Sequence, residues 1–250
     1  MMRSIQLRST STQENASRLS AEPEIEADDG KQNLVDLAYA EIKRAILDNV
    51  FPPGFQAAEV DIAKRLEMSR TPVHEAMARL QEEGLVRIQP RRGILVRGLT
   101  AEDVQEIYDV IIALEGAAAA RLAQLGDGER HRLVAALEAQ TSAMQLALEG
   151  DHLKQWAVAD ETFHDLVVAN CGNRRLQRIV GTVKDQLHRA RMFTLNLRPL
   201  PVTSGQEHRT LIAAIAAGDS ETASVAARLH RTHARDQLLP LIARLNLNNL

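Results

Sequence analysis

The 250-residue sequence has a single cysteine, Cys171, so a disulfide within one chain is excluded and a reducing compartment is expected. Aromatic residues make up only 3% of the chain, which predicts a core built from aliphatic side chains. No apolar run approaches the roughly 20 residues of a membrane span. Arg3 and Arg8 are not followed by the apolar stretch of a signal peptide. These features predict a cytoplasmic protein without membrane contact.

The sequence also lacks an excess of positive charge. Its net charge is −3, which argues against binding nucleic acid through overall charge. The charge is uneven, however: residues 31–100 carry a small positive excess, whereas both flanking segments are negative. Residues 1–30 are rich in polar and acidic side chains, a composition that predicts a disordered tail. Any contact with phosphate must therefore come from locally placed arginines.

The stretch 69–84 predicts a short helix that presents one face to solvent. Ser69 is a common N-cap residue, Pro72 suits the first helical turn and Gly84 is typical of the position after a helix. The apolar stripe of this helix comprises Val73, Met77 and Leu80. The exposed face comprises Arg70, Thr71, His74 and Arg79.

The surrounding segments complete a recognisable unit. Residues 59–66 form a second short amphipathic helix, so the two helices and their tight turn predict a helix-turn-helix. Residues 86–89 and 94–96 alternate apolar and polar side chains around a turn that contains Arg91, Arg92 and Gly93. This β-hairpin with a basic tip predicts a winged helix at residues 31–98, with one helix in the major groove of double-stranded DNA.

Residues 99–250 show helical periodicity and no alternating strand pattern. Six helices joined by short connections are predicted, which favours an antiparallel bundle for effector binding and dimerisation. The expected helices cover residues 100–125, 127–149, 151–169, 173–196, 204–217 and 220 onward. Pro240 is expected to end or kink the last of them. The predicted fold is thus mainly α, with an N-terminal winged helix followed by this bundle.

One group of side chains in the bundle has the chemistry of a metal site. Asp160 and His164 are four residues apart and therefore share one face of a helix, and His208 and His230 lie on the last two predicted helices. Spacing alone is a weak signal, because an Asp-x-x-x-His pair occurs often by chance and most histidines are not ligands.

Residues 35–97 resemble the DNA-binding domain of GntR-type bacterial transcription regulators. The resemblance rests on motifs that keep the family's order and spacing. They are Pro53-Gly54, Glu59 to Leu66, Ser69-Arg70-Thr71-Pro72-Val73, Glu83-Gly84-Leu85-Val86 and Arg92-Gly93. One position departs from the family, which usually carries a DNA-contacting Arg where this chain has His74. A neutral imidazole lacks the fixed charge and the two-pronged hydrogen bonding of Arg, so the operator preference at this position is expected to differ.

The helical half resembles the FCD ligand-binding domain of the FadR-type branch, and six helices suit its VanR-like group. This resemblance implies that Asp160, His164, His208 and His230 hold a divalent metal. Three imidazoles and a carboxylate suit zinc, nickel or manganese. The resemblance also implies a small effector, commonly an organic acid, bound near the metal. The family's carboxylate-binding Arg is replaced by Ile111, so Arg189, Arg191 and His188 are the remaining candidates for binding it.

The resemblance as a whole implies a homodimeric transcription regulator, not an enzyme, that binds an inverted-repeat operator. Repression is the family's common mode of action. Two alternatives remain open from the residues alone: a metal-dependent hydrolase that uses the Asp/His site, and a sensor whose ligand is the metal ion itself.

Overall fold

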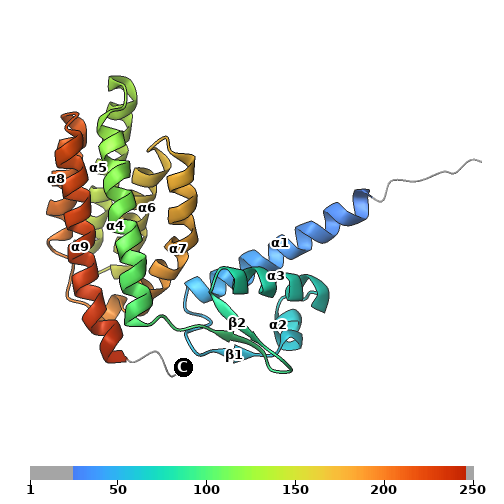
Figure 1. Ribbon diagram of the computed structural model, residues 1–250. Coiled ribbons are helices and arrows are strands. Elements are labelled where there is room, and N and C mark those ends of the chain that lie inside the picture. The colour runs from blue at the N-terminus through green and yellow to red at the C-terminus, as the bar shows by residue number, and fades with distance from the viewer. Residues whose placement is uncertain (1–24, 246–250) are drawn as a thin grey trace, which may run out of the picture.

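The computed structural model describes residues 25–245, with side chains from residue 33 onward, as an N-terminal winged helix beside a helical bundle (Figure 1). The predicted mainly α fold is confirmed. The winged helix consists of α1 (Ile25–Leu47), β1 (Gln56–Ala57), α2 (Glu59–Arg65), α3 (Arg70–Glu82), β2 (Val86–Gln89) and β3 (Gly93–Val96). The bundle consists of α4 (Ala101–Ala123), α5 (Asp127–Glu149), α6 (Leu153–Ala169), α7 (Arg174–Phe193), the 3-10 helix η1 (Leu195–Leu197), α8 (Ser204–Ala216) and α9 (Ser220–Leu245).

An apolar stripe that includes Val35, Ala38 and Ile42 predicts a first helix from about Asn33 to Asp48, and the helix in the structure is longer. It begins at Ile25 and not near Asn33, so residues 25–30 of the predicted tail belong to α1. The remainder of that tail lies outside the described residues. The stripe expected in this helix is present, since Val35, Ala38 and Ile42 are buried. They pack on the core of the winged helix, where tertiary contacts stabilise the helix.

The predicted hairpin is joined by a strand that the sequence did not indicate. β1 pairs antiparallel with β3, which also pairs with β2, so the sheet order is β1-β3-β2. Gly93 opens β3 with a φ of +86°, and a Cβ there would lie 2.0 Å from the carbonyl oxygen of Ala57. The glycine is therefore required by the close approach of β1 to β3.

The bundle buries its own aliphatic core. Large side chains with almost no exposed surface, such as Ile111, Leu122, Leu137 and Phe163, line its interior. Of the two effects expected of Pro240, it does not end the last helix, because α9 continues to Leu245 with this proline inside it. Leu238 and Ile242 are both buried, and their packing holds the final turn although the proline supplies no N–H. Over residues 25–245, no helix is both long and apolar enough to cross a bilayer.

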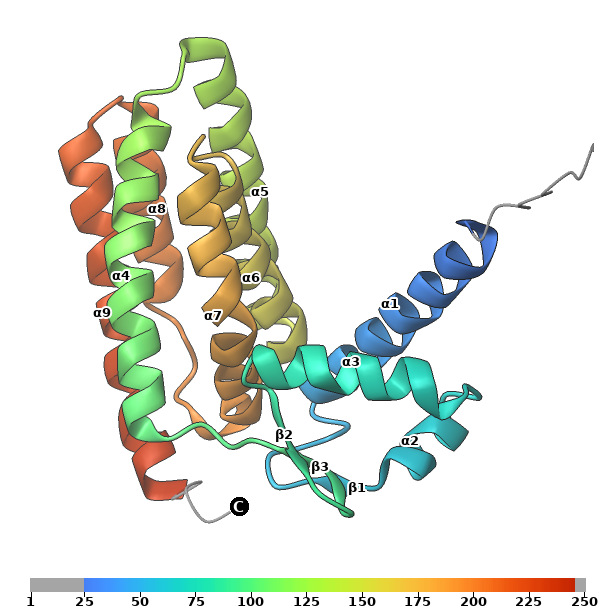
Figure 2. The same ribbon diagram turned by 45° about the vertical axis from the view of Figure 1, so that its right-hand side comes forward.

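The winged helix contacts the bundle mainly through α7, which runs toward α1 and α3 in Figure 2. Lys43 Nζ of α1 forms an ion pair with Asp185 Oδ2 at 2.6 Å. Gln186 Nε2 donates to the backbone oxygen of Glu83, just after α3, at 3.2 Å. Arg189 Nη2 donates to the backbone oxygen of Arg97, just after β3. Three neighbouring positions of α7 thus contact three separate segments of the winged helix.

Candidate functional site

The outward face of α3 carries the side chains that the sequence assigned to DNA. Arg70, Thr71 and His74 are exposed, whereas Val73 and Met77 on the opposite face are buried. This burial fixes the rotation of α3 about its axis. The first three side chains therefore point together to solvent, as a recognition helix requires.

The other predicted DNA contacts divide into two groups. At the wing tip, Arg91 and Arg92 are exposed in the turn between β2 and β3, where they are free to approach a phosphate. Arg79 is placed differently. Its Nη1 atom donates to Asp36 Oδ1 at 2.5 Å, and its guanidinium lies 4.2 Å from the centre of the Tyr39 ring. Arg79 thus ties α3 to α1.

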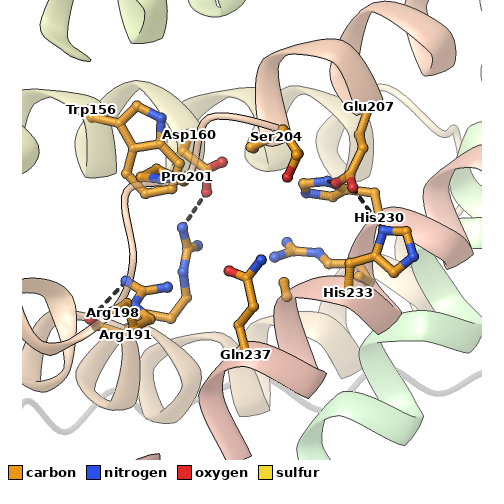
Figure 3. Close-up of a pocket in the computed structure, with 13 residues that line it drawn as sticks. Trp156, Asp160, Arg191, Arg198, Pro201, Ser204, Glu207, His230, His233 and Gln237 are labelled. Atoms are coloured by element: carbon orange, nitrogen blue, oxygen red, sulfur yellow. Dashed lines mark hydrogen bonds and ion pairs between the residues drawn. The ribbon is translucent and has the colours of Figure 1, made fainter.

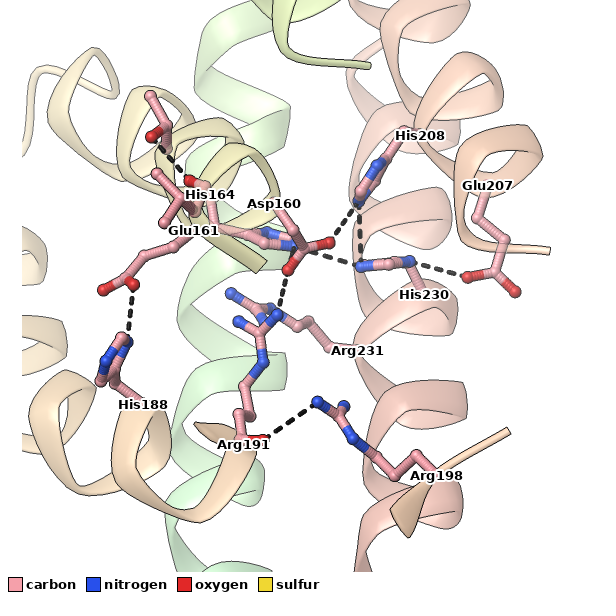
Figure 4. A network of polar contacts seen from close by, with 12 residues as sticks. Asp160, Glu161, His164, His188, Arg191, Arg198, Glu207, His208, His230 and Arg231 are labelled. Carbon is pink, nitrogen blue, oxygen red and sulfur yellow. Dashed lines mark hydrogen bonds and ion pairs between the residues drawn. The ribbon is translucent and has the colours of Figure 1, made fainter. Parts of the chain in front are cut away.

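The four predicted metal ligands converge inside the bundle. Asp160 and His164 come from α6, His208 from α8 and His230 from α9; all four are buried, and one donor atom from each lies within 4.8 Å of the others. The Nε2 atom of His230 lies 3.2 Å from that of His164 and 3.2 Å from that of His208. His208 Nε2 lies 3.7 Å from Asp160 Oδ1. Figure 4 shows this convergence.

Two carboxylates set the protonation of the histidine rings. Glu115 Oε2 of α4 lies 3.0 Å from His164 Nδ1, and Glu207 Oε2 of α8 lies 2.7 Å from His230 Nδ1. A carboxylate only accepts hydrogen bonds, so each Nδ1 atom donates its proton outward. In the neutral rings, the two Nε2 atoms then carry lone pairs directed into the centre.

Burial and nearby charges keep His164, His208 and Asp160 in the protonation states that bind metals. Burial, reinforced by Arg231, lowers the pKa of His164 to about 4, so this ring is neutral at neutral pH. Burial also holds the pKa of His208 well below its usual value. Burial alone would raise the pKa of the Asp160 carboxyl, but the Arg191 guanidinium, which donates to its Oδ2 atom, holds that pKa below its usual range. The centre therefore combines the neutral imidazoles of His164 and His208 with the ionised carboxylate of Asp160.

A pocket opens beside this centre and is rich in cationic groups (Figure 3). Arg191, Arg198 and Arg231 all line it. Arg198 Nη2 donates to the backbone oxygen of Arg191 at 3.1 Å, while its buried Nε atom has no hydrogen-bond partner among the described residues. The buried hydroxyl of Ser204, the first residue of α8, likewise has none there. Burial lowers the pKa of Arg198 to about 10, a value at which the guanidinium is still charged at neutral pH.

The structure separates Arg189 from the other two residues predicted to bind an acidic effector. Arg191 is in the pocket and contacts Asp160. His188 and Arg191 both line a second cavity, where His188 Nδ1 lies 2.6 Å from Glu161 Oε2. Arg189 lines neither cavity. It is only 3% exposed and points to the junction with the winged helix.

Several residues of the site were missed by the sequence interpretation. The buried Arg231 donates to both carboxylate oxygens of Glu115, which links this carboxylate to α9 as well as to His164. One signal could have found Glu115, because it falls on the apolar face of α4 that contains Tyr108 and Ile111 at helical spacing. Nothing in the sequence near Arg198 marks it, since it lies in an irregular connection between α7 and α8.

Two family models match the two halves of the chain. The model for "Bacterial regulatory proteins, gntR family" matches residues 34–96, and the model for the FCD domain matches residues 106–233. The matched ranges coincide with the winged helix and with most of the bundle.

Three relatives with curated descriptions and one solved structure illustrate the similarity. An uncharacterised HTH-type transcriptional regulator from Agrobacterium vitis is 58% identical over 54% of this chain and 79% of its own. The Bacillus subtilis regulator YdhC is 30% identical over 78% of this chain and 86% of its own. The Escherichia coli transcriptional repressor RspR is 25% identical over 77% of this chain and 83% of its own. A transcriptional regulator from Rhodococcus sp. RHA1 shares the fold, with a TM-score of 0.70 and 23% identity over 84% of this chain and 98% of its own.

Proposed function

The chain belongs to the GntR family of bacterial regulatory proteins and carries an FCD domain, and from this premise we propose that it is a metal-dependent repressor controlled by an organic acid. GntR regulators bind DNA and FCD domains bind small-molecule effectors, so the chain is a DNA-binding transcription regulator and not an enzyme. The alternative of a metal-dependent hydrolase is not supported, because the matching families and relatives are regulators. The metal, the class of effector, repression, the dimer and the operator symmetry are parts of our proposal, as is action in the cytoplasm.

The arrangement of His164 and His230 is the observation that supports binding of a metal ion. Their Nδ1 protons are directed to Glu115 and Glu207, so their Nε2 lone pairs face each other at 3.2 Å. Facing lone pairs repel, whereas a cation between them makes both atoms ligands. Imidazole nitrogens about 2.0–2.1 Å from a tetrahedral zinc ion lie roughly 3.3 Å apart. Asp160, His164, His208 and His230 therefore fit a divalent cation, and zinc, nickel and manganese suit this donor set alike.

The pocket beside the centre favours an anionic effector. Arg191, Arg198 and Arg231 all line it, and Arg191 also donates to Asp160 Oδ2. The Nε atom of Arg198 and the hydroxyl of Ser204, which have no hydrogen-bond partner within residues 25–245, are the donors that a carboxylate would satisfy. A buried donor without an acceptor costs about 1–3 kcal/mol, which binding of a carboxylate would recover. An organic acid that also reaches the metal would be held at two points.

DNA binding is assigned to the exposed face of α3 and to the wing. Arg70, Thr71 and His74 would enter the major groove, while Arg91 and Arg92 would contact neighbouring phosphates. Arg79 is committed to Asp36 and Tyr39, so its contribution is to hold α3 in place rather than to read bases.

The test of DNA binding is selection of fragments from the organism's own genome by the purified protein. The wild type should recover a discrete inverted repeat, and a variant with Arg70→Ala and Arg92→Ala should not. A variant with Arg132→Ala, which removes an exposed arginine of α5, is the control for loss of positive charge. Recovery of the same fragments by wild type and double variant would reject the assignment of α3 and the wing.

The test of the metal centre is equilibrium dialysis against zinc, nickel and manganese. His208→Ala should abolish tight binding, and Glu207→Gln should weaken it by about 10–100-fold because it removes the partner of His230. His131→Ala, at an exposed histidine of α5, should bind metal as the wild type does.

The test of the effector measures operator affinity with metal alone and with organic acids at fixed metal. A response to metal alone would replace metabolite sensing with metal sensing.

A further inference from the structure

The exposed face of α3 contains an imidazole ring, that of His74, which can act as a donor or as an acceptor toward a base. His74 lies one turn into the helix, and 62% of its side chain is exposed. It shares this face with Arg70 and Thr71, which precede it by four and three residues. Both of those neighbours can donate, and arginine can do nothing else. The role of His74 depends on which ring nitrogen carries its proton.

Glu59, the first residue of α2, determines which ring nitrogen of His74 carries the proton. Its Oε2 atom lies 3.3 Å from His74 Nδ1, and its Oε1 atom lies 3.9 Å from Arg70 Nε. Only 21% of the Glu59 side chain is exposed, so its carboxylate is held between the two helices. Because a carboxylate accepts hydrogen bonds, Nδ1 of His74 is the nitrogen that donates. In the neutral ring, the outward Nε2 atom then carries a lone pair.

We propose that Glu59 is a positioning residue that makes His74 a hydrogen-bond acceptor toward DNA. The inference rests on the proposed DNA-binding role of α3. In the major groove, adenine N6 and cytosine N4 are the base atoms that donate, whereas guanine presents only the acceptors O6 and N7. His74 therefore selects adenine or cytosine at its position in each half-site and disfavours guanine.

The same contact explains how a carboxylate is tolerated on a DNA-binding face. Glu59 would repel phosphates if it were free, but it is placed between the Arg70 guanidinium and the His74 ring. Its charge is directed at these two groups, which leaves the rest of the Arg70 guanidinium available to DNA. Replacing the carboxylate by an amide alters this arrangement without changing its shape.

The experiment is selection from a randomised operator at about pH 8. The proteins are the wild type, His74→Ala, Glu59→Gln and the control Glu82→Gln, which changes an exposed glutamate at the end of α3. The wild type and the control should prefer adenine or cytosine over guanine by about tenfold at one position of each half-site. His74→Ala should lose the preference only there. Glu59→Gln should also lose it, because an amide can donate to Nδ1 and move the proton to Nε2.

Two results would overturn this inference without overturning the proposed DNA-binding function. One is a wild-type preference for guanine at the position that His74→Ala relaxes. The other is an unchanged preference in Glu59→Gln. Failure of the wild type to select any motif would instead overturn the proposed DNA-binding function, and the inference with it.

Discussion

At the scale of single residues, Glu115 connects the proposed metal centre to the framework of the bundle. It is 2% exposed, contacts His164 at 3.0 Å and receives two hydrogen bonds from the buried Arg231. Burial alone would raise the pKa of Glu115, but Arg231 and His164 hold it well below its usual range. One carboxylate therefore orients a proposed metal ligand, His164, and neutralises the buried Arg231 at the same time.

We expect Glu115→Gln to lower the free energy of unfolding by about 3–5 kcal/mol, because it leaves the buried charge of Arg231 without a counterion. Denaturant unfolding at neutral pH with a chelator present measures this change. Glu138→Gln, at an exposed site of α5, should alter it by less than about 0.5 kcal/mol. The difference between wild type and Glu115→Gln should shrink as the pH falls below the usual carboxyl pKa of 4.5, because the unfolded chain then takes up the proton. Equal stability of the two proteins at neutral pH would contradict this account.

At the scale of elements, α7 connects the Asp/His cluster of the bundle to the winged helix. Lys184, His188 and Arg191 follow a spacing of four and three residues and contact acidic side chains of α6. Asp185, Gln186 and Arg189 lie on a second face, and each contacts the winged helix. A change in the partner of Arg191 at the centre would therefore act on the helix that positions the DNA-binding half.

We expect Asp185→Asn to weaken the coupling between the bundle and DNA binding. The substitution removes the ion pair with Lys43 while it keeps the size of the side chain. Metal affinity should stay within about twofold of the wild-type value, because Asp185 does not touch the centre. The effect of metal or acid on operator affinity, typically worth about 1–3 kcal/mol in allosteric proteins, should fall by about half. Operator affinity measured by fluorescence anisotropy, with and without metal, gives this coupling directly.

The matched control is Asp165→Asn, which removes an ion pair between Lys184 of α7 and α6. Like Asp185→Asn, it removes one ion pair of α7, but it leaves the contacts with the winged helix in place. If both variants lost the same share of the coupling, the junction with the winged helix would have no special part in it.

At the scale of the whole molecule, each chain presents one recognition helix and one wing. Since closed two-fold symmetry is the commonest form of homo-oligomer, a dimer would present two recognition helices to two symmetric half-sites. We expect two protomers per inverted repeat in sedimentation experiments with labelled operator. A single half-site should bind about 10²–10⁴-fold more weakly, since only one of the two linked contacts is made. Binding of one protomer with equal affinity for full and half sites would reject the dimeric mode.

The sequence by itself determined the features that depend on short-range spacing. Helical periodicity placed Val73 and Met77 in the core and left Arg70 and His74 outside, and the structure agrees. The four-residue separation of Asp160 and His164 put both on one face of α6, because such residues share a face in any regular helix. Turn residues likewise located the wing.

Only the tertiary structure decided which distant groups meet. Glu115 reaches His164 across 49 positions of the chain, and Arg189 contacts Arg97 rather than the pocket that Arg191 lines. β1 was missed for the same reason. Local spacing fixes the direction of a side chain relative to its own helix or strand, whereas the packing of elements against one another fixes what that side chain meets.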